Sequence, residues 1–459
     1  MKQKHIQHLY NRAGFAVSYK KLINLKDKPK IKVVNSLFAD ALKTQPLELD
    51  LIAFKAFSES LGSYSKMNRI NRQKLNKKNR EKIKDLNYAW IERLVNPDAV
   101  LIEKMTLFWA NVFVCKDNNV LSMQHYNNTL RKFALGDFKQ FVKAIAKEAS
   151  MSKYLNNKQN VKKRPNENFA RELMELFTLG IGHYTEQDVK ESARAFTGWS
   201  NNRKGAFISN PKKHDDGIKT FLGKTGNFDG DAIIDIILEQ KQCAKFICEK
   251  LYRYFVNPNI NETNLKEITA VFYKDYDIQK VMYHIFKSEW FYDDQNIGIK
   301  IKSPIELLVG IQTIIPIQFQ KPQQLLYLQK MMGQILLNPP NVAGWKGGKS
   351  WIDSNTLMFR LKLPSILLNN AIINLESKGE FEDNFENYYK KNKKNYIKTL
   401  PSWNDFEKEY AAVSIKELKK IILISNIDKD TEAFLDNLKF NSNKDLCIQL
   451  MSIPEYQLC

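Results

Sequence analysis

The chain has 459 residues, of which 43% are hydrophobic and 12% aromatic, and this composition excludes an intrinsically disordered protein. Its 71 Lys and Arg outnumber its 50 Asp and Glu, which gives a formal charge of +21. Such an excess favours anionic partners, namely nucleic acids, acidic glycans or a negatively charged membrane surface. The lysines are nevertheless spread through an asparagine-rich chain, as a general composition bias would also produce.

The cysteines and the apolar segments indicate the compartment. Five cysteines without a CxxC pair predict neither a disulfide framework nor a structural zinc site. The N-terminal residues 1–18 lack the apolar core of a secretory signal, and no stretch reaches the roughly 18 apolar residues of a membrane span. We therefore expect a cytoplasmic protein without a transmembrane segment.

Helical periodicity dominates the chain, and strand-like alternation is scarce, so we predict an all-α fold. Short helices are expected over residues 1–60. Residues 66–84 hold nine basic residues and one acid and form a basic helix or loop. Two interpretations stay open for it: a solvated surface, or a nucleic-acid contact that lacks interleaved aromatic residues for base stacking. After a break at Pro97, a strongly apolar helix is expected to lie in the core.

The sequence NENFARELMELFTLGIGHYTEQDVKESARAFTGW, residues 166–199, predicts a helical hairpin over 166–198. Asn166 is a natural N-cap and Gly180 a natural stop for a first helix over 167–179. Thr185 and Asp188 form a capping box for a second helix. These features explain the hairpin as structure alone, with Arg171 pairing to acidic neighbours on its own helix.

The later elements are predicted to be helices up to a loop at 338–352, NPPNVAGWKGGKSWI, which aromatic burial would hold in place. We expect a large multi-helix domain over residues 1–364, with long Gly/Pro/Trp loops, and a smaller helical region over 365–459. Within the latter, the polar stretch 376–398 is expected to be mobile.

The hairpin also supports a functional interpretation. Arg171, Glu172 and Glu175 share one helix stripe and, with His183, are the candidate catalytic residues. Two carboxylates and an imidazole could divide acid and base roles or hold a divalent metal, although no established metal motif is present. The candidate substrate-binding residues are Asn168, Asp188, His214, Asp215, Lys219, Trp345 and Trp351.

The hairpin, "HDDGIKTFLG" (214–223), "PPNVAGWKGGKSWI" (339–352) and the ending "SIPEYQLC" resemble, in this order, the landmarks of the bacterial DUF1800 family. The resemblance covers nearly the whole chain. It implies a largely helical protein of unassigned function, often encoded beside DUF1501 proteins, which are similar to sulfatases and phosphatases. Many members read FWHNHF where this chain has FWANVF (108–113), so a role of those two histidines is lost or relocated here. Many also carry export signals, which leaves co-export to the periplasm or cell envelope with a signal-bearing partner as the alternative location.

Three functions follow as hypotheses. The first is an accessory or assembly protein that works with a DUF1501-type partner on anionic or glycan material. The second is a hydrolase or transferase that uses a carboxylate and histidine cleft, with or without a metal. The third and least favoured is nucleic-acid binding through residues 66–84.

Overall fold

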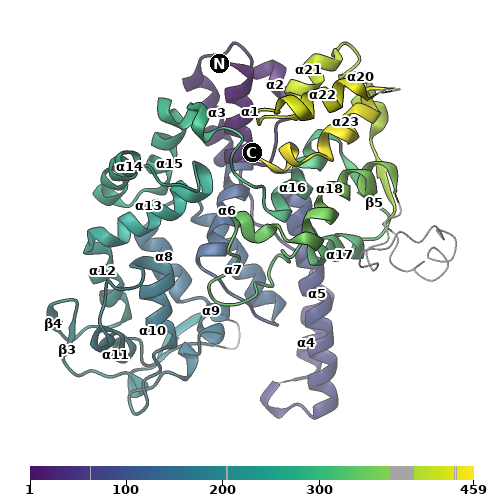
Figure 1. The fold of residues 1–459 in the computed structure, drawn as a ribbon. Helices are drawn as coiled ribbons and strands as arrows, with labels where there is room; N and C mark the ends of the chain where they lie inside the picture. The colour runs from purple at the N-terminus through teal and green to yellow at the C-terminus, as the bar shows by residue number, and fades with distance from the viewer. Residues whose placement is uncertain (63, 203–204, 372–396, 439, 441) are drawn as a thin grey trace. The chain divides into compact units, whose positions relative to one another are not determined.

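The computed structural model of the chain describes residues 1–62, 64–202, 205–371, 397–438, 440 and 442–459 (Figure 1). The all-α prediction is confirmed, since 63% of the structure is helical. The strands in the described residues are short antiparallel pairs: β1 (Trp199–Asn201) with β2 (Phe207–Ser209), β3 (Lys219–Phe221) with β4 (Lys224–Gly226), and β5 (Ile317–Phe319) with β6 (Thr399–Pro401). None of the described helices is both long and apolar enough to cross a membrane.

The chain divides into two compact units, and each is discontinuous in sequence. The first comprises residues 1–33, 289–335 and 346–459, and the second comprises 34–288 and 336–345. The sequence-based boundary at residue 364 stays a prediction. It falls inside one helix, α18 (Ser354–Asn369), which carries Pro364. Most of the predicted mobile stretch, residues 376–396, lies outside the described residues.

The second unit contains most of the predicted candidate residues. Its helices are α4 (Ile52–Ser60), α5 (Arg69–Val95), α6 (Val100–Val112), α7 (Val120–Lys132), α8 (Phe138–Ala146), α9 (Ala149–Tyr154), α10 (Asn168–Glu172), α11 (Glu186–Ala195), α12 (Gly230–Glu239), α13 (Lys241–Phe255), α14 (Glu262–Asp275) and α15 (Ile278–Lys287). It also holds the 3-10 turns at Tyr64–Lys66, Asn157–Gln159 and Pro211–Lys213. Helix α3 (Lys30–Ala41) begins in the first unit and ends in the second. The segment 66–84, predicted as helix or loop, is helical from Arg69 onward.

The core of the second unit forms around α6. As predicted, α5 ends before Pro97 and an apolar helix follows, with Met105 and Trp109 fully buried. The indole of Trp109 donates to the carbonyl of Ala134 at 3.1 Å and contacts the rings of Phe138 and Phe141. The low exposure around this helix is what its predominantly apolar sequence predicts, although Glu103 and Lys104 are buried with it.

The first unit is built around polar groups as well as apolar ones. Its helices are α1 (Gln3–Ala13), α2 (Tyr19–Leu25), α16 (Pro304–Ile314), α17 (Gln323–Met331), α18, α20 (Trp403–Glu409), α21 (Ile415–Ile422), α22 (Lys429–Asn437) and α23 (Asn443–Met451), and its 3-10 turns are Glu289–Tyr292, Asp294–Asn296, Gly348–Trp351 and Pro454–Gln457. The buried Arg360 donates to the carbonyl of Lys302 at 2.6 Å, and Lys300 pairs with Glu306 at 2.8 Å. Such pairing satisfies charges that would be costly to bury alone.

Candidate functional site

The predicted hairpin is present, but its first helix has an unexpected form. An α-helical start, α10, continues as a π-helical turn over Leu173–Thr178 instead of as one α-helix to residue 179. The hydroxyl of Thr178 donates to the carbonyl of Leu173, five residues earlier, at 2.6 Å. π-helical turns are rare and frequently occur at functional sites.

The two candidate carboxylates, Glu172 and Glu175, influence one another in this turn. Partial burial raises the pKa of Glu172, the negative charge of Glu175 raises it further, and Arg171 opposes the shift. Glu175 accepts a hydrogen bond of 2.9 Å from the hydroxyl of Tyr184, and burial together with this bond raises the pKa of Tyr184 to about 12. One carboxyl therefore holds its proton more readily than usual beside a second that is hydrogen-bonded.

Arg171 is occupied by structural partners. It pairs with Glu167 at 3.1 Å, as its spacing predicts. Arg171 also donates two hydrogen bonds, of 2.7 and 2.8 Å, to Glu186 on α11. The sequence had suggested only acidic partners on its own helix. Arg171 thus ties the two helices of the hairpin together.

The other hairpin candidates do not gather around the carboxylates through any described contact. Asn168 and His183 are exposed. Asp188 closes the predicted capping box with Thr185, and its second oxygen accepts from the backbone of Leu222 at 2.8 Å. Their functional roles stay predictions.

The residues from the HDDG segment form a loop that is bonded to α11 and to the residues that follow it. Asp215 makes two hydrogen bonds, of 2.9 and 3.1 Å, with Arg194, which lowers the pKa of that carboxyl. The buried ammonium of Lys219 donates to two loop carbonyls, at 2.6 and 2.9 Å, and burial lowers its pKa. His214 contacts the backbone of Thr197 at 2.9 Å. These contacts account for the residue types without a ligand, and ligand binding stays a prediction.

The two candidate tryptophans are buried, as an aromatic-pinned loop requires, and belong to different compact units. Asn111 holds the Trp345 backbone from both sides, donating to its carbonyl at 3.0 Å and accepting from its amide at 2.8 Å. Sequence reasoning missed this role, although Asn111 lies in the FWANVF motif. Val112, at one of the two altered positions, is buried.

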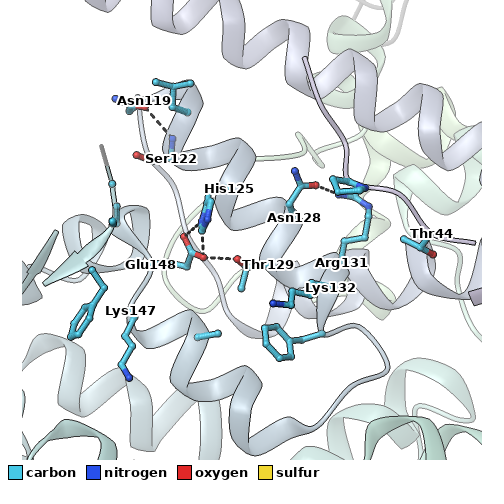
Figure 2. Close-up of a pocket in the computed structure, with 18 of the residues that line it drawn as sticks. Thr44, Asn119, Ser122, His125, Asn128, Thr129, Arg131, Lys132, Lys147 and Glu148 are labelled. Atoms are coloured by element: carbon cyan, nitrogen blue, oxygen red, sulfur yellow. Dashed lines mark hydrogen bonds and ion pairs between the residues drawn. The ribbon is translucent and has the colours of Figure 1, made fainter. Parts of the chain in front are cut away.

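A second site was not predicted: a pocket of about 900 Å³ in the second unit. Helix α7 supplies one wall, because Ser122, His125, Thr129 and Lys132 recur at helical spacing opposite the buried face of that helix. Figure 2 shows these side chains facing the segment that joins α8 to α9. The periodicity was readable in the sequence, but the partner segment was not.

A histidine and a carboxylate meet in this pocket (Figure 2). Both oxygens of Glu148 lie within 3.0 Å of Nδ1 of His125, and Thr129 donates to the same carboxylate at 2.5 Å. The Glu148 side chain is 5% exposed and that of His125 is 75% exposed. The hydrogen bond to Glu148 raises the pKa of His125 against the opposing effect of burial. The buried carboxylate thus orients an imidazole that solvent can reach.

The rest of the lining combines small apolar and neutral polar side chains with several cations and two phenylalanine rings. Arg131, Lys132 and Lys147 line the pocket together with Phe133 and Phe207, and Glu148 is the one acid among the described lining residues. Arg131 is neutralised by the buried Glu103, and Lys147 by Asp231 at 2.7 Å. The Lys132 ammonium lies 5.2 Å from the Phe133 ring centre and forms no ion pair with a described carboxylate.

No group of three or more His, Cys, Asp or Glu side chains is placed to hold a metal ion in the parts of the chain that the structure describes. The five cysteines are buried and free.

Comparison with known proteins gives one match. The family model described as "Protein of unknown function (DUF1800)" matches residues 8–458. No curated protein and no solved structure matches the chain.

Proposed function

Because the chain belongs to the DUF1800 family, whose description assigns no activity, we propose a function from its pocket. The protein is an accessory factor that binds an anionic glycan and works with a DUF1501-type, sulfatase-like partner. The proposal of a DUF1501-type partner rests on the resemblance noted in the sequence. The ligand class rests on the pocket.

We infer the ligand class from one observation, namely that cations and aromatic rings line the same cavity. Lys132 offers its charge to a ligand, and Glu148 fixes the orientation of the His125 imidazole, which solvent can reach. Phe133 and Phe207 supply flat apolar surfaces, while Ser122 and other polar lining groups supply hydrogen bonds. This combination suits a sugar that carries sulfate or carboxylate groups.

The test is calorimetric titration with a sulfated oligosaccharide and with its desulfated counterpart. We expect the sulfated form to bind and Lys132→Gln to weaken binding about tenfold, the loss of one charge-assisted hydrogen bond. Lys190→Gln, at an exposed lysine outside the pocket lining, is the matched control. Equal affinity for both sugars, or equal effects of the two substitutions, would overturn the proposal.

The second candidate is a hydrolase or transferase that uses Glu172 as general acid and Glu175 as base. The partial burial of Glu172 beside Glu175 favours it, because burial raises the pKa of Glu172 and a carboxyl that keeps its proton can act as an acid. A panel of nitrophenyl glycosides, sulfates and phosphates tests it. We expect turnover that Glu172→Gln abolishes and that Glu167→Gln, at the N-cap of the same helix, preserves. No turnover by the unmodified protein on any of these substrates would refute this candidate.

A further inference from the structure

The solvent-facing side of helix α5 is unusually basic. Ile70, Lys74, Lys77 and Lys84 fall within about 80° of one another around the helix axis. This stripe lies opposite Leu75, which is buried in a small core shared with α4 and α7. The burial pattern therefore fixes which face of α5 remains in contact with solvent.

Most of the charge along this segment is exposed. Seven of the nine basic residues between 66 and 84 are exposed: Lys66, Arg69, Lys74, Lys77, Lys78, Arg80 and Lys84. Glu81, the one acid among them, pairs with Lys78 at 3.4 Å. The other nearby acid, Asp85, pairs with Lys82 at 2.9 Å. The face thus keeps a large net positive charge.

Exposed apolar side chains accompany this charge at the start of the helix. Ile70 is 62% exposed and Tyr64 is 52% exposed. Arg72 donates from Nε to the carbonyl of Tyr64 at 3.2 Å, and its guanidinium lies 5.4 Å from the Tyr64 ring centre. This contact places Tyr64 beside the first turns of α5. Two large apolar side chains left in water beside a cationic stripe indicate a surface that binds a partner or a membrane.

We infer that the exposed face of α5 binds the surface of an anionic lipid bilayer. The lysines lie against the charged head groups, while Ile70 and Tyr64 enter the boundary between head groups and acyl chains. A nucleic acid explains the charge but not Ile70. Moreover, no aromatic residue lies between residues 66 and 84 to stack on bases. This inference concerns a surface separate from the lining of the proposed glycan pocket.

The experiment is flotation of the full chain with vesicles of phosphatidylglycerol and phosphatidylcholine, compared with pure phosphatidylcholine. One cationic residue near such a surface contributes about fivefold in affinity, so Lys74→Gln, Lys77→Gln and Lys84→Gln together should weaken binding about a hundredfold. The matched control neutralises three exposed lysines elsewhere in the unit: Lys158, Lys190 and Lys212.

Separate arms test the apolar part and the competing partner. Ile70→Ser should weaken vesicle binding about tenfold, because one apolar side chain no longer enters the interface. Circular dichroism checks that each variant keeps its helical content. Equal flotation with pure phosphatidylcholine, or equal losses in the two triple variants, would overturn the inference. Retention on duplex DNA that depends on the same lysines, without flotation, would assign the face to nucleic acid instead.

Discussion

The buried ion pair between Arg131 and Glu103 yields the most quantitative prediction. Both side chains are 2% exposed, and two hydrogen bonds of 2.6 and 3.0 Å join them. Arg131→Met leaves the Glu103 carboxylate buried with only the Trp90 indole, at 3.3 Å, as a described hydrogen-bond donor. Removing one partner of a buried pair costs about 3–5 kcal/mol, because the other charge stays out of water unpaired. We expect a loss of stability in that range, and a smaller one when Glu103→Gln removes the second charge too.

Amide hydrogen exchange on peptides from α6 and α7 is the appropriate assay, because a chain with two compact units need not unfold in one step. The matched control is Lys143→Met. It breaks the more exposed pair of Lys143 with Asp235 and should cost no more than about 1 kcal/mol. A cost below 1 kcal/mol for Arg131→Met would contradict this prediction. The same holds if the variant with both Arg131→Met and Glu103→Gln is as unstable as Arg131→Met alone.

Three further predictions concern the two sites and the Trp345 loop. Glu148→Gln should lower the pKa of His125, measured by NMR titration of its ring, since Glu148 is what raises it. The stabilisation from this pair should be complete below the unfolded-state pKa of His125, and it should disappear as pH rises through the higher folded-state pKa. A midpoint of denaturation that does not fall over this pH range would contradict an ion pair between His125 and Glu148. Glu175→Gln should lower the pKa of Glu172 only part of the way to its usual range, because burial is the larger cause of the raised pKa. Carbon-detected NMR of labelled Glu measures this pKa. An unchanged pKa would show that the charge of Glu175 does not influence Glu172. Gly344→Ala should destabilise the Trp345 loop by about 2 kcal/mol, because Gly344 has a φ of +73° and an added Cβ would lie 2.3 Å from a side-chain oxygen on α6. Unchanged amide hydrogen exchange in that loop would contradict this prediction.

The local design of the hairpin was predictable to within a few residues. The capping box of Thr185 with Asp188 and the pair of Arg171 with Glu167 involve neighbours three and four positions apart, so sequence spacing specifies them. The π-helical turn was not predictable, because a change from α to π hydrogen bonding responds to packing around the helix and leaves no periodic signal. The choice of Glu186 as the main partner of Arg171 depended on how the second helix folds back.

The contrast is sharper for the pocket. His125 and Glu148 are 23 residues apart, in segments where each looks like an ordinary surface residue. Asn111 and Trp345 are 234 residues apart, and their contact is invisible to any local pattern. Loop closure over such distances depends on the packing of the helices between them.

The amino-acid sequence by itself determined the helical fold, the caps, the basic character of residues 66–84 and the family, because these depend on periodicity, local hydrogen bonding and an ordered series of motifs. Only the tertiary structure decided which charges are available. It buried Trp345, engaged Arg171 and Asp215 in ion pairs, and brought His125 to Glu148 in an open pocket. The physical reason is that burial and pairing are properties of the space between helices, whereas spacing along one helix specifies only which face a side chain occupies.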